Sequence, residues 1–149
     1  MFLKQSNGIC APYYNKEGSE MNSPQVPISW GELFDKITIL QIKLENLTSK
    51  KALKNVEQEL KKLQSISTQD CPKTMETTQL EGELRQINQQ LWDIEDKIRD
   101  KERANSFDDE FIQLARSVYI TNDERSRIKR KINDMLESEI VEEKSYAEY

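Results

Sequence analysis

Residues Leu80–Ile98 read LEGELRQINQQLWDIEDKI, with an apolar side chain at every third or fourth position and mostly charged or amide side chains between. Because an α-helix turns once in 3.6 residues, this spacing gathers the apolar side chains into one stripe. Three other stretches repeat the pattern. A helix with one apolar stripe buries it against another helix, so we predict an all-α protein. The stripe of this segment is formed by Leu80, Leu84, Ile87, Leu91, Ile94 and Ile98.

The composition narrows the class of protein. A chain of 149 residues is enough for one core, and its 33% of charged residues with four Gly and four Pro favour long, solvated helices. The net charge of −5 argues against a nucleic-acid partner. Without histidine, the two cysteines make a zinc site improbable, and we expect no cofactor. The N-terminus lacks an apolar run for a signal peptide or a membrane span, so we expect a soluble cytoplasmic protein with no membrane partner.

Three regions follow from the pattern along the chain. Residues 1–27 are punctuated by Gly and Pro without periodicity, which predicts a poorly structured N-terminal arm. Because Met21 stands just before the first helical signal, both Met1 and Met21 are candidate starts. Residues 28–137 form the predicted helical bundle, and residues 138–149 form an acidic C-terminal tail.

The first helical signal begins with a capping box at Ser29-Trp30-Gly31-Glu32. In this motif the serine oxygen accepts from the Glu32 amide, and the Glu32 carboxylate accepts from the amide of Ser29. The helix has more apolar surface than one stripe needs, so we expect it to contact more than one partner. After Leu47 the phase of the stripe slips, and Ser49 offers the cap of a second helix.

The second half of the chain predicts two longer helices. We interpret residues 66–73 as a linker, and the third helix as running from a capping box at Thr78 to about Arg103. Ser106 would cap the fourth helix. Because so few residues join the last two helices, they must form an antiparallel hairpin. The predicted fold is an antiparallel helical hairpin, a coiled-coil-like bundle of about four helices.

The fourth helix interrupts its own apolar stripe with Thr121 and Arg125. Pairing the hairpin about its turn sets Arg125 alongside Glu83 as a counter-charge, or alongside Asn88 or Gln86 as a neutral partner. A polar layer in a helical seam specifies register or oligomeric state, and a binding site for an anion is the alternative. The candidate residues of this layer, which include a second ion pair between Glu95 and Arg116, are Glu95, Arg116, Tyr119, Asn122 and Arg125.

Two other chemical interpretations stay open. Glu32 with Asp35, and Asp93 with Asp96, are carboxylate pairs one turn apart, which could hold Mg²⁺ for pyrophosphate chemistry. This spacing is loosely similar to that of helical nucleotide pyrophosphohydrolases, but no phosphate loop accompanies it and no catalytic residue is assigned. Basic residues crowd residues 125–131 and could bind a phosphate. They point in several directions, however, as a solvated face would, and the acidic tail can neutralise them.

Five segments after the arm carry a further signal. They are Pro27–Leu40, Leu91–Asp96, Leu114–Tyr119, Thr121–Asp123 and Val141–Tyr146. Through them the chain from Val26 onward resembles a family of small bacterial and phage proteins known only as a domain of unknown function. The resemblance implies a helical fold and transfers no activity.

These observations favour a protein-interaction or assembly module over an enzyme. Long helices with narrow apolar stripes rarely close a full core alone, so we expect a homo-oligomer, with another protein as a further potential partner. A small helical enzyme and an anion-binding protein are the alternatives.

Overall fold

A computed structural model describes residue 24 and residues 26–145, and this part of the chain contains helices and no strand. The all-α prediction is confirmed. The predicted N-terminal arm lies almost entirely outside the described residues. None of the described helices is long and apolar enough to cross a membrane. The helices are α1 (Trp30–Asn46), α2 (Lys50–Asp70), α3 (Met75–Arg103) and α4 (Asp109–Met135).

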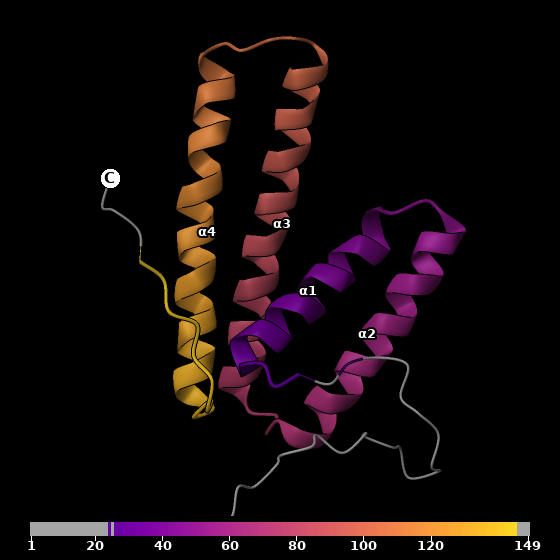
Figure 1. Cartoon of the computed structure of the whole chain (residues 1–149), viewed down its shortest axis with the longest axis vertical. Coiled ribbons are helices and arrows are strands. Elements are labelled where there is room, and N and C mark those ends of the chain that lie inside the picture. The colour runs from indigo at the N-terminus through magenta and orange to yellow at the C-terminus, as the bar shows by residue number, and fades with distance from the viewer. Residues whose placement is uncertain (1–23, 25, 146–149) are drawn as a thin grey trace, which may run out of the picture.

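The helices form two hairpins, α1 with α2 and α3 with α4 (Figure 1). Of the described helices, α1 packs against all three others, whereas α2 packs only against α1. The α3/α4 hairpin is the longer one and extends well beyond the level at which α1 leans against it (Figure 1). The predicted helical bundle is therefore confirmed, with α1 as the connection between the two hairpins.

The sequence of α1 explains this central position, because the helix carries two apolar faces. Leu33, Ile37 and Leu40 pack against the stripe of α2, and Phe34 packs into the α3/α4 hairpin. The expectation that the first helix contacts more than one partner is thus met within the chain. The buried apolar residues on the partner helices are Val56 and Leu60 of α2, Leu80 and Leu84 of α3, and Ile128 and Ile132 of α4.

The start and the end of α2 agree with the sequence-based predictions only in part. The break after Leu47 is confirmed, since α1 ends at Asn46 and the Ser49 side chain accepts from the third amide of α2. The linker predicted at residues 66–73 is wrong, because α2 continues to Asp70. The hydroxyl groups of Ser65 and Ser67 bond carbonyls of the preceding turn, so these polar side chains are satisfied within the helix.

The predicted caps of the second hairpin are displaced by a few residues. A capping box does open α3, but it joins Thr74 to Thr77 and does not involve Thr78. The N-cap of α4 is Asp108, which accepts from its own helix at 3.0 Å, while Ser106 only supports it through a bond of 2.9 Å. Hydrogen bonds, chiefly from Lys101, lower the pKa of Asp108 to about 2, so this cap stays charged.

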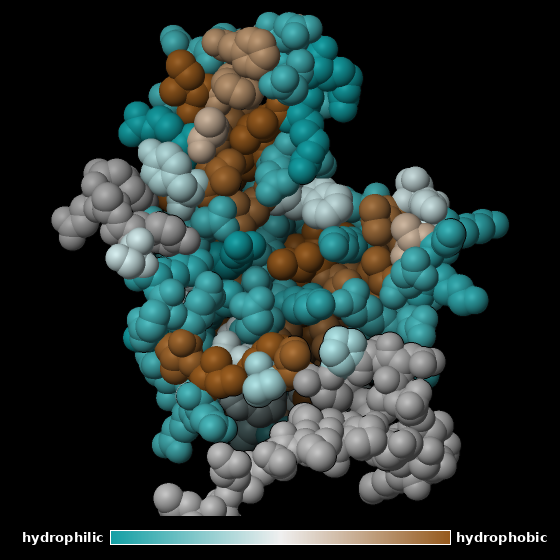
Figure 2. Space-filling view, viewed as in Figure 1, coloured by the Kyte–Doolittle hydropathy of each residue, from teal (hydrophilic) through white to brown (hydrophobic). Residues whose placement is uncertain are grey.

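The outer half of the second hairpin, residues 92–124, differs from the rest of the fold because none of its residues is buried. We call it the distal hairpin. Its apolar side chains lie between two helices only, and Figure 2 shows them as a column on the face where α1 lies lower down. The largest exposed apolar side chains of this half are Phe107, Ile112, Tyr119 and Ile120.

The C-terminal tail begins with a reversal of the chain. Glu137 has a positive φ of 49°, and the Ser138 amide donates to the Asn133 carbonyl at 2.8 Å. This left-handed residue ends α4 in the manner of a Schellman motif. The tail then runs back along α4 (Figure 1), so its acidic residues pass beside the basic residues of that helix.

α1 and α4 approach each other closely at Gly31, in the first turn of α1. A Cβ atom at this position would lie 2.5 Å from the carbonyl oxygen of Lys129, and the Gly31 amide donates to the Asn133 side chain at 2.7 Å. Only a residue without a side chain allows the backbones of α1 and α4 to come this near.

We predict that Gly31→Ala destabilises the protein by about 3 kcal/mol, since α1 must move away from α4 and breaks the contacts of its first turn. Gly82→Ala is the matched control, because a Cβ there meets nothing within 4 Å. It should stabilise α3 by about 0.5–1 kcal/mol. Chemical denaturation measures both, and equal effects of the two changes would contradict the close approach.

Candidate functional site

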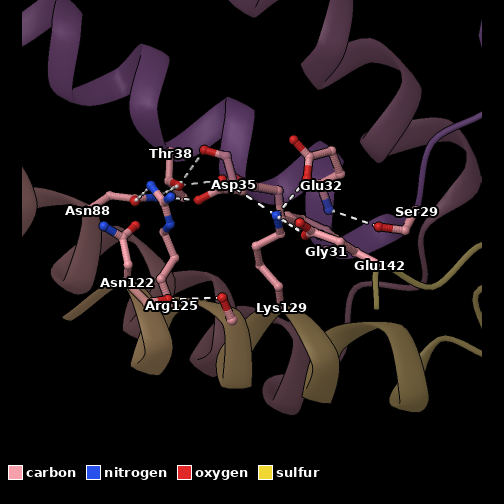
Figure 3. Close-up of polar contacts among 12 residues, drawn as sticks. Ser29, Gly31, Glu32, Asp35, Thr38, Asn88, Asn122, Arg125, Lys129 and Glu142 are labelled. Carbon is pink, nitrogen blue, oxygen red and sulfur yellow. Dashed lines mark hydrogen bonds and ion pairs between the residues drawn. The ribbon is translucent and has the colours of Figure 1, made fainter. Parts of the chain in front are cut away.

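A cluster of buried polar residues lies where α1, α3 and α4 meet (Figure 3). Polar side chains are rarely this buried unless they bond one another. The cluster is therefore the strongest candidate for a functional site in the described part of the chain. Its members, each less than a tenth exposed, are Asp35 and Thr38 of α1, Asn88 of α3, and Lys129 and Asn133 of α4.

The inner part of the cluster joins α1 to α3. The Asn88 amide donates to the Asp35 carboxylate at 2.8 Å and to the Thr38 hydroxyl oxygen at 3.0 Å. Thr38 in turn donates to backbone carbonyls of its own helix. Asn88 thus satisfies two side chains of α1 at once, which fixes the rotation of α1 against α3.

The outer part of the cluster is organised by Lys129. Its ammonium lies 2.6 Å from Glu32 and 2.9 Å from Glu142, with the second oxygen of Asp35 at 4.0 Å. Burial disfavours the ammonium form, but the hydrogen bonds that it donates to Glu32 and Glu142 outweigh this effect and raise the pKa of Lys129. Three carboxylates from two segments therefore surround one buried cation (Figure 3).

The tail closes the cluster on its solvent side. The hydrogen bond from Lys129 lowers the pKa of Glu142, with further contributions from the charges of Lys144 and Arg125. The neighbouring Glu143 pairs with Arg130 at 3.1 Å. The sequence-based interpretation that the tail neutralises the basic residues of the fourth helix thus agrees with these contacts.

Arg125 is the member of the predicted polar layer that reaches the cluster. Its Nη1 lies 3.5 Å from Asn88 Oδ1, so the neutral partner suggested by hairpin pairing is the right one. The counter-charge predicted at Glu83 is wrong, because Glu83 accepts from Gln79 one turn earlier on α3. Within the described residues the buried Nε of Arg125 has no hydrogen-bond partner, so this guanidinium is only partly satisfied.

The other four residues of the predicted layer lie apart from the cluster. Glu95 accepts from Arg99 of its own helix at 2.7 Å instead of meeting Arg116, which is exposed. Asn122 donates to the carbonyl of Val118 at 3.0 Å, and Tyr119 is 39% exposed on the distal hairpin. Long side chains bond most easily within one helix turn, which explains why the pairing across the hairpin fails.

The two carboxylate pairs considered for a metal also separate. Glu32 and Asp35 share the cation of Lys129, so a lysine occupies the place a metal would take. Asp93 accepts from Gln89, and Asp96 lies 3.7 Å from Arg99, both further along α3. No group of three potential ligands forms among the described residues. The geometry therefore does not support the magnesium interpretation.

Sequence reasoning named Asp35 and Asn88 in other roles but missed the remaining residues that build the cluster. Lys129 was one of several basic residues of the fourth helix, without a signal that it is buried. Asn133 and Thr38 were not singled out. For Thr38 a signal was nevertheless present, because it lies four residues after Phe34 and four residues before Ile42, within an apolar stripe.

A comparison with models of known protein families identifies the family of the chain. The model of the family of unknown function DUF6165 matches residues 24–149. The chain belongs to this family. The matched range includes every residue of the cluster and the whole tail. The comparison with curated proteins gave no match, and neither did the comparison with solved structures.

The partly satisfied guanidinium leads to a prediction about stability. Arg125→Leu should preserve or raise the midpoint of thermal unfolding, because the change removes a half-buried charge with an unsatisfied donor. Asn88→Leu should cost about 3 kcal/mol, because it leaves the Asp35 carboxylate and the Thr38 hydroxyl without their donor. Loss of stability in Arg125→Leu as large as in Asn88→Leu would show that the guanidinium is what compensates Asp35.

The lowered pKa of Glu142 leads to a prediction about acid. A carboxyl group whose pKa is lower in the folded state stabilises the protein above its unfolded pKa, and this contribution disappears as the pH falls through the folded value. At pH 7, Glu142→Gln should therefore unfold at a lower temperature than the unmodified protein. The difference should begin to shrink near the unfolded pKa of a glutamate, about 4.3, and disappear once the pH is below the lowered pKa of Glu142. Glu139→Gln, another tail substitution, is the control and should leave the unfolding temperature unchanged both at pH 7 and at acid pH.

Proposed function

We propose that this protein is a self-associating helical module whose contact surface is the distal hairpin. The observation that carries the proposal is that residues 92–124 form two apolar-striped helices without one buried residue. Phe107 is 55% exposed and Ile112 is 50% exposed, which is unusual for side chains of this size. Both belong to the half of the hairpin that neither α1 nor α2 covers.

The position of these side chains supports the proposal. On α4, Lys129 and Asn133 face α1, and steps of three and four residues continue the same face to Tyr119 and Ile112. On α3, the same rule continues the face of Asn88 to Trp92. The face that α1 covers at the base of the hairpin therefore runs on, uncovered, towards the tip.

We propose that a second copy of this chain covers that face. Glu95 and Arg99 lie one turn apart on α3, on the same face as Trp92, and both are exposed. A two-fold axis passing between them would set Glu95 of each copy against Arg99 of the other, as a symmetric interface requires. The apolar column would then be closed by two further helices, as in a four-helix bundle.

The test is a measurement of mass in solution. We expect light scattering after size-exclusion chromatography to give at least twice the mass of one chain, and Ile112→Glu to shift the protein towards the monomer. A charge on this exposed apolar surface could not be buried in an interface without a partner. The expected shift is at least tenfold in the dissociation constant.

Ile66→Glu serves as the matched control, since Ile66 is a comparably exposed isoleucine on α2. It should leave the mass unchanged. A monomeric unmodified protein at all concentrations up to the millimolar range would overturn the proposal. Equal dissociation by both substitutions would assign the interface to another surface.

A further inference from the structure

A cavity of about 210 Å³ lies between α4 and the tail, next to the buried cluster. It is smaller than the roughly 300–1,000 Å³ of sites for drug-sized ligands, so it suits a small chemical group. Four of its eight lining residues are cationic, and both acidic ones belong to the tail. The lining residues are Ser126, Arg127, Lys129, Arg130, Asn133, Glu142, Glu143 and Lys144.

The two tail carboxylates occupy positions at which the α4 cations would hold any anion. Glu142 lies 2.9 Å from the Lys129 ammonium, and Glu143 lies 3.1 Å from the Arg130 guanidinium. Arg130 also reaches the Glu142 carbonyl oxygen at 3.4 Å. Two adjacent negative charges are thus held by one lysine and one arginine.

We propose that this cavity is a binding site for a phosphate group and that Glu142 and Glu143 fill it in the free protein. A phosphate dianion carries the charge of the two carboxylates and matches the guanidinium fork of Arg130. Lys129 supplies a buried positive charge, which Glu32 and Asp35 fix from beneath. The same phosphate chemistry is present in inorganic phosphate and in phosphate monoesters.

The contacts of the tail allow a phosphate ligand to displace it from α4. Glu143 and its partner Arg130 are 79% and 45% exposed, and such an exposed ion pair contributes little to stability. Glu142 is 47% exposed, although its partner Lys129 is buried. Residues 138–145 of the tail have no helical structure of their own. A phosphate that binds Lys129 and Arg130 replaces these two carboxylates, whereas the contacts of Glu32 and Asp35 beneath stay in place.

The test is calorimetric titration with inorganic phosphate and, separately, with adenosine monophosphate, at an ionic strength matched with chloride. The double variant Glu142→Gln with Glu143→Gln removes the competing charges. We expect it to bind phosphate at least tenfold more tightly than the unmodified protein. If the variant binds inorganic phosphate more tightly than the nucleotide, the ligand is the free ion. If it binds the nucleotide more tightly than inorganic phosphate, the ligand is a phosphate monoester.

Two further variants keep the test specific. Adding Arg130→Gln to the double variant should abolish phosphate binding, because the guanidinium fork is lost. Adding Arg103→Gln should change nothing, since Arg103 is exposed at the end of α3 and remote from the cavity. The proposal is overturned if the double variant gives no heat beyond the chloride control, or if both added arginine substitutions have the same effect. Neither result depends on the oligomeric state.

Discussion

The contact between the backbone of α1 at Gly31 and the carbonyl of Lys129 is the constraint on which the candidate site depends. Because no side chain separates the two helices there, the first turn of α1 lies directly on α4. Glu32 and Asp35 are then within reach of the Lys129 ammonium, and Asn133 can cap the Gly31 amide. One turn of α1 later, Phe34 enters the apolar part of the α3/α4 hairpin. A wider separation would leave the lysine buried without its carboxylates.

A buried lysine is a costly way to join helices, because the loss of hydration can exceed the attraction it gains. Here the ammonium donates two short hydrogen bonds to carboxylates, and a third carboxylate lies nearby. These hydrogen bonds require donors and acceptors to point towards one another, whereas apolar packing has no such directional requirement. α1, α4 and the tail must all present an oxygen or a nitrogen at one point. The cluster therefore selects one arrangement of the helices among several that would bury similar apolar area.

The helices and their pairing could be predicted from local patterns, whereas the cluster could not. The stripe from Leu80 to Ile98 predicts α3, and pairing across the hairpin correctly placed Arg125 beside Asn88. The burial of Lys129 depends on how α1 crosses α4, and no local pattern encodes a crossing angle. The return of the tail depends on a left-handed conformation at Glu137, which glutamate rarely adopts. Both features arise from contacts between residues distant in sequence.

The absence of buried residues between 92 and 124 has a consequence for how α3 and α4 exchange their amide protons. Each helix is continuous, but only the half near α1 packs against that helix. The outer half of each helix packs only against the other helix of the hairpin. Amides near the fully buried Leu84 can exchange only through large-scale unfolding, whereas those towards Asn105 can exchange through fraying of the tip. Protection should therefore decline along a single helix. If copies associate at the tip, its protection also becomes a function of protein concentration.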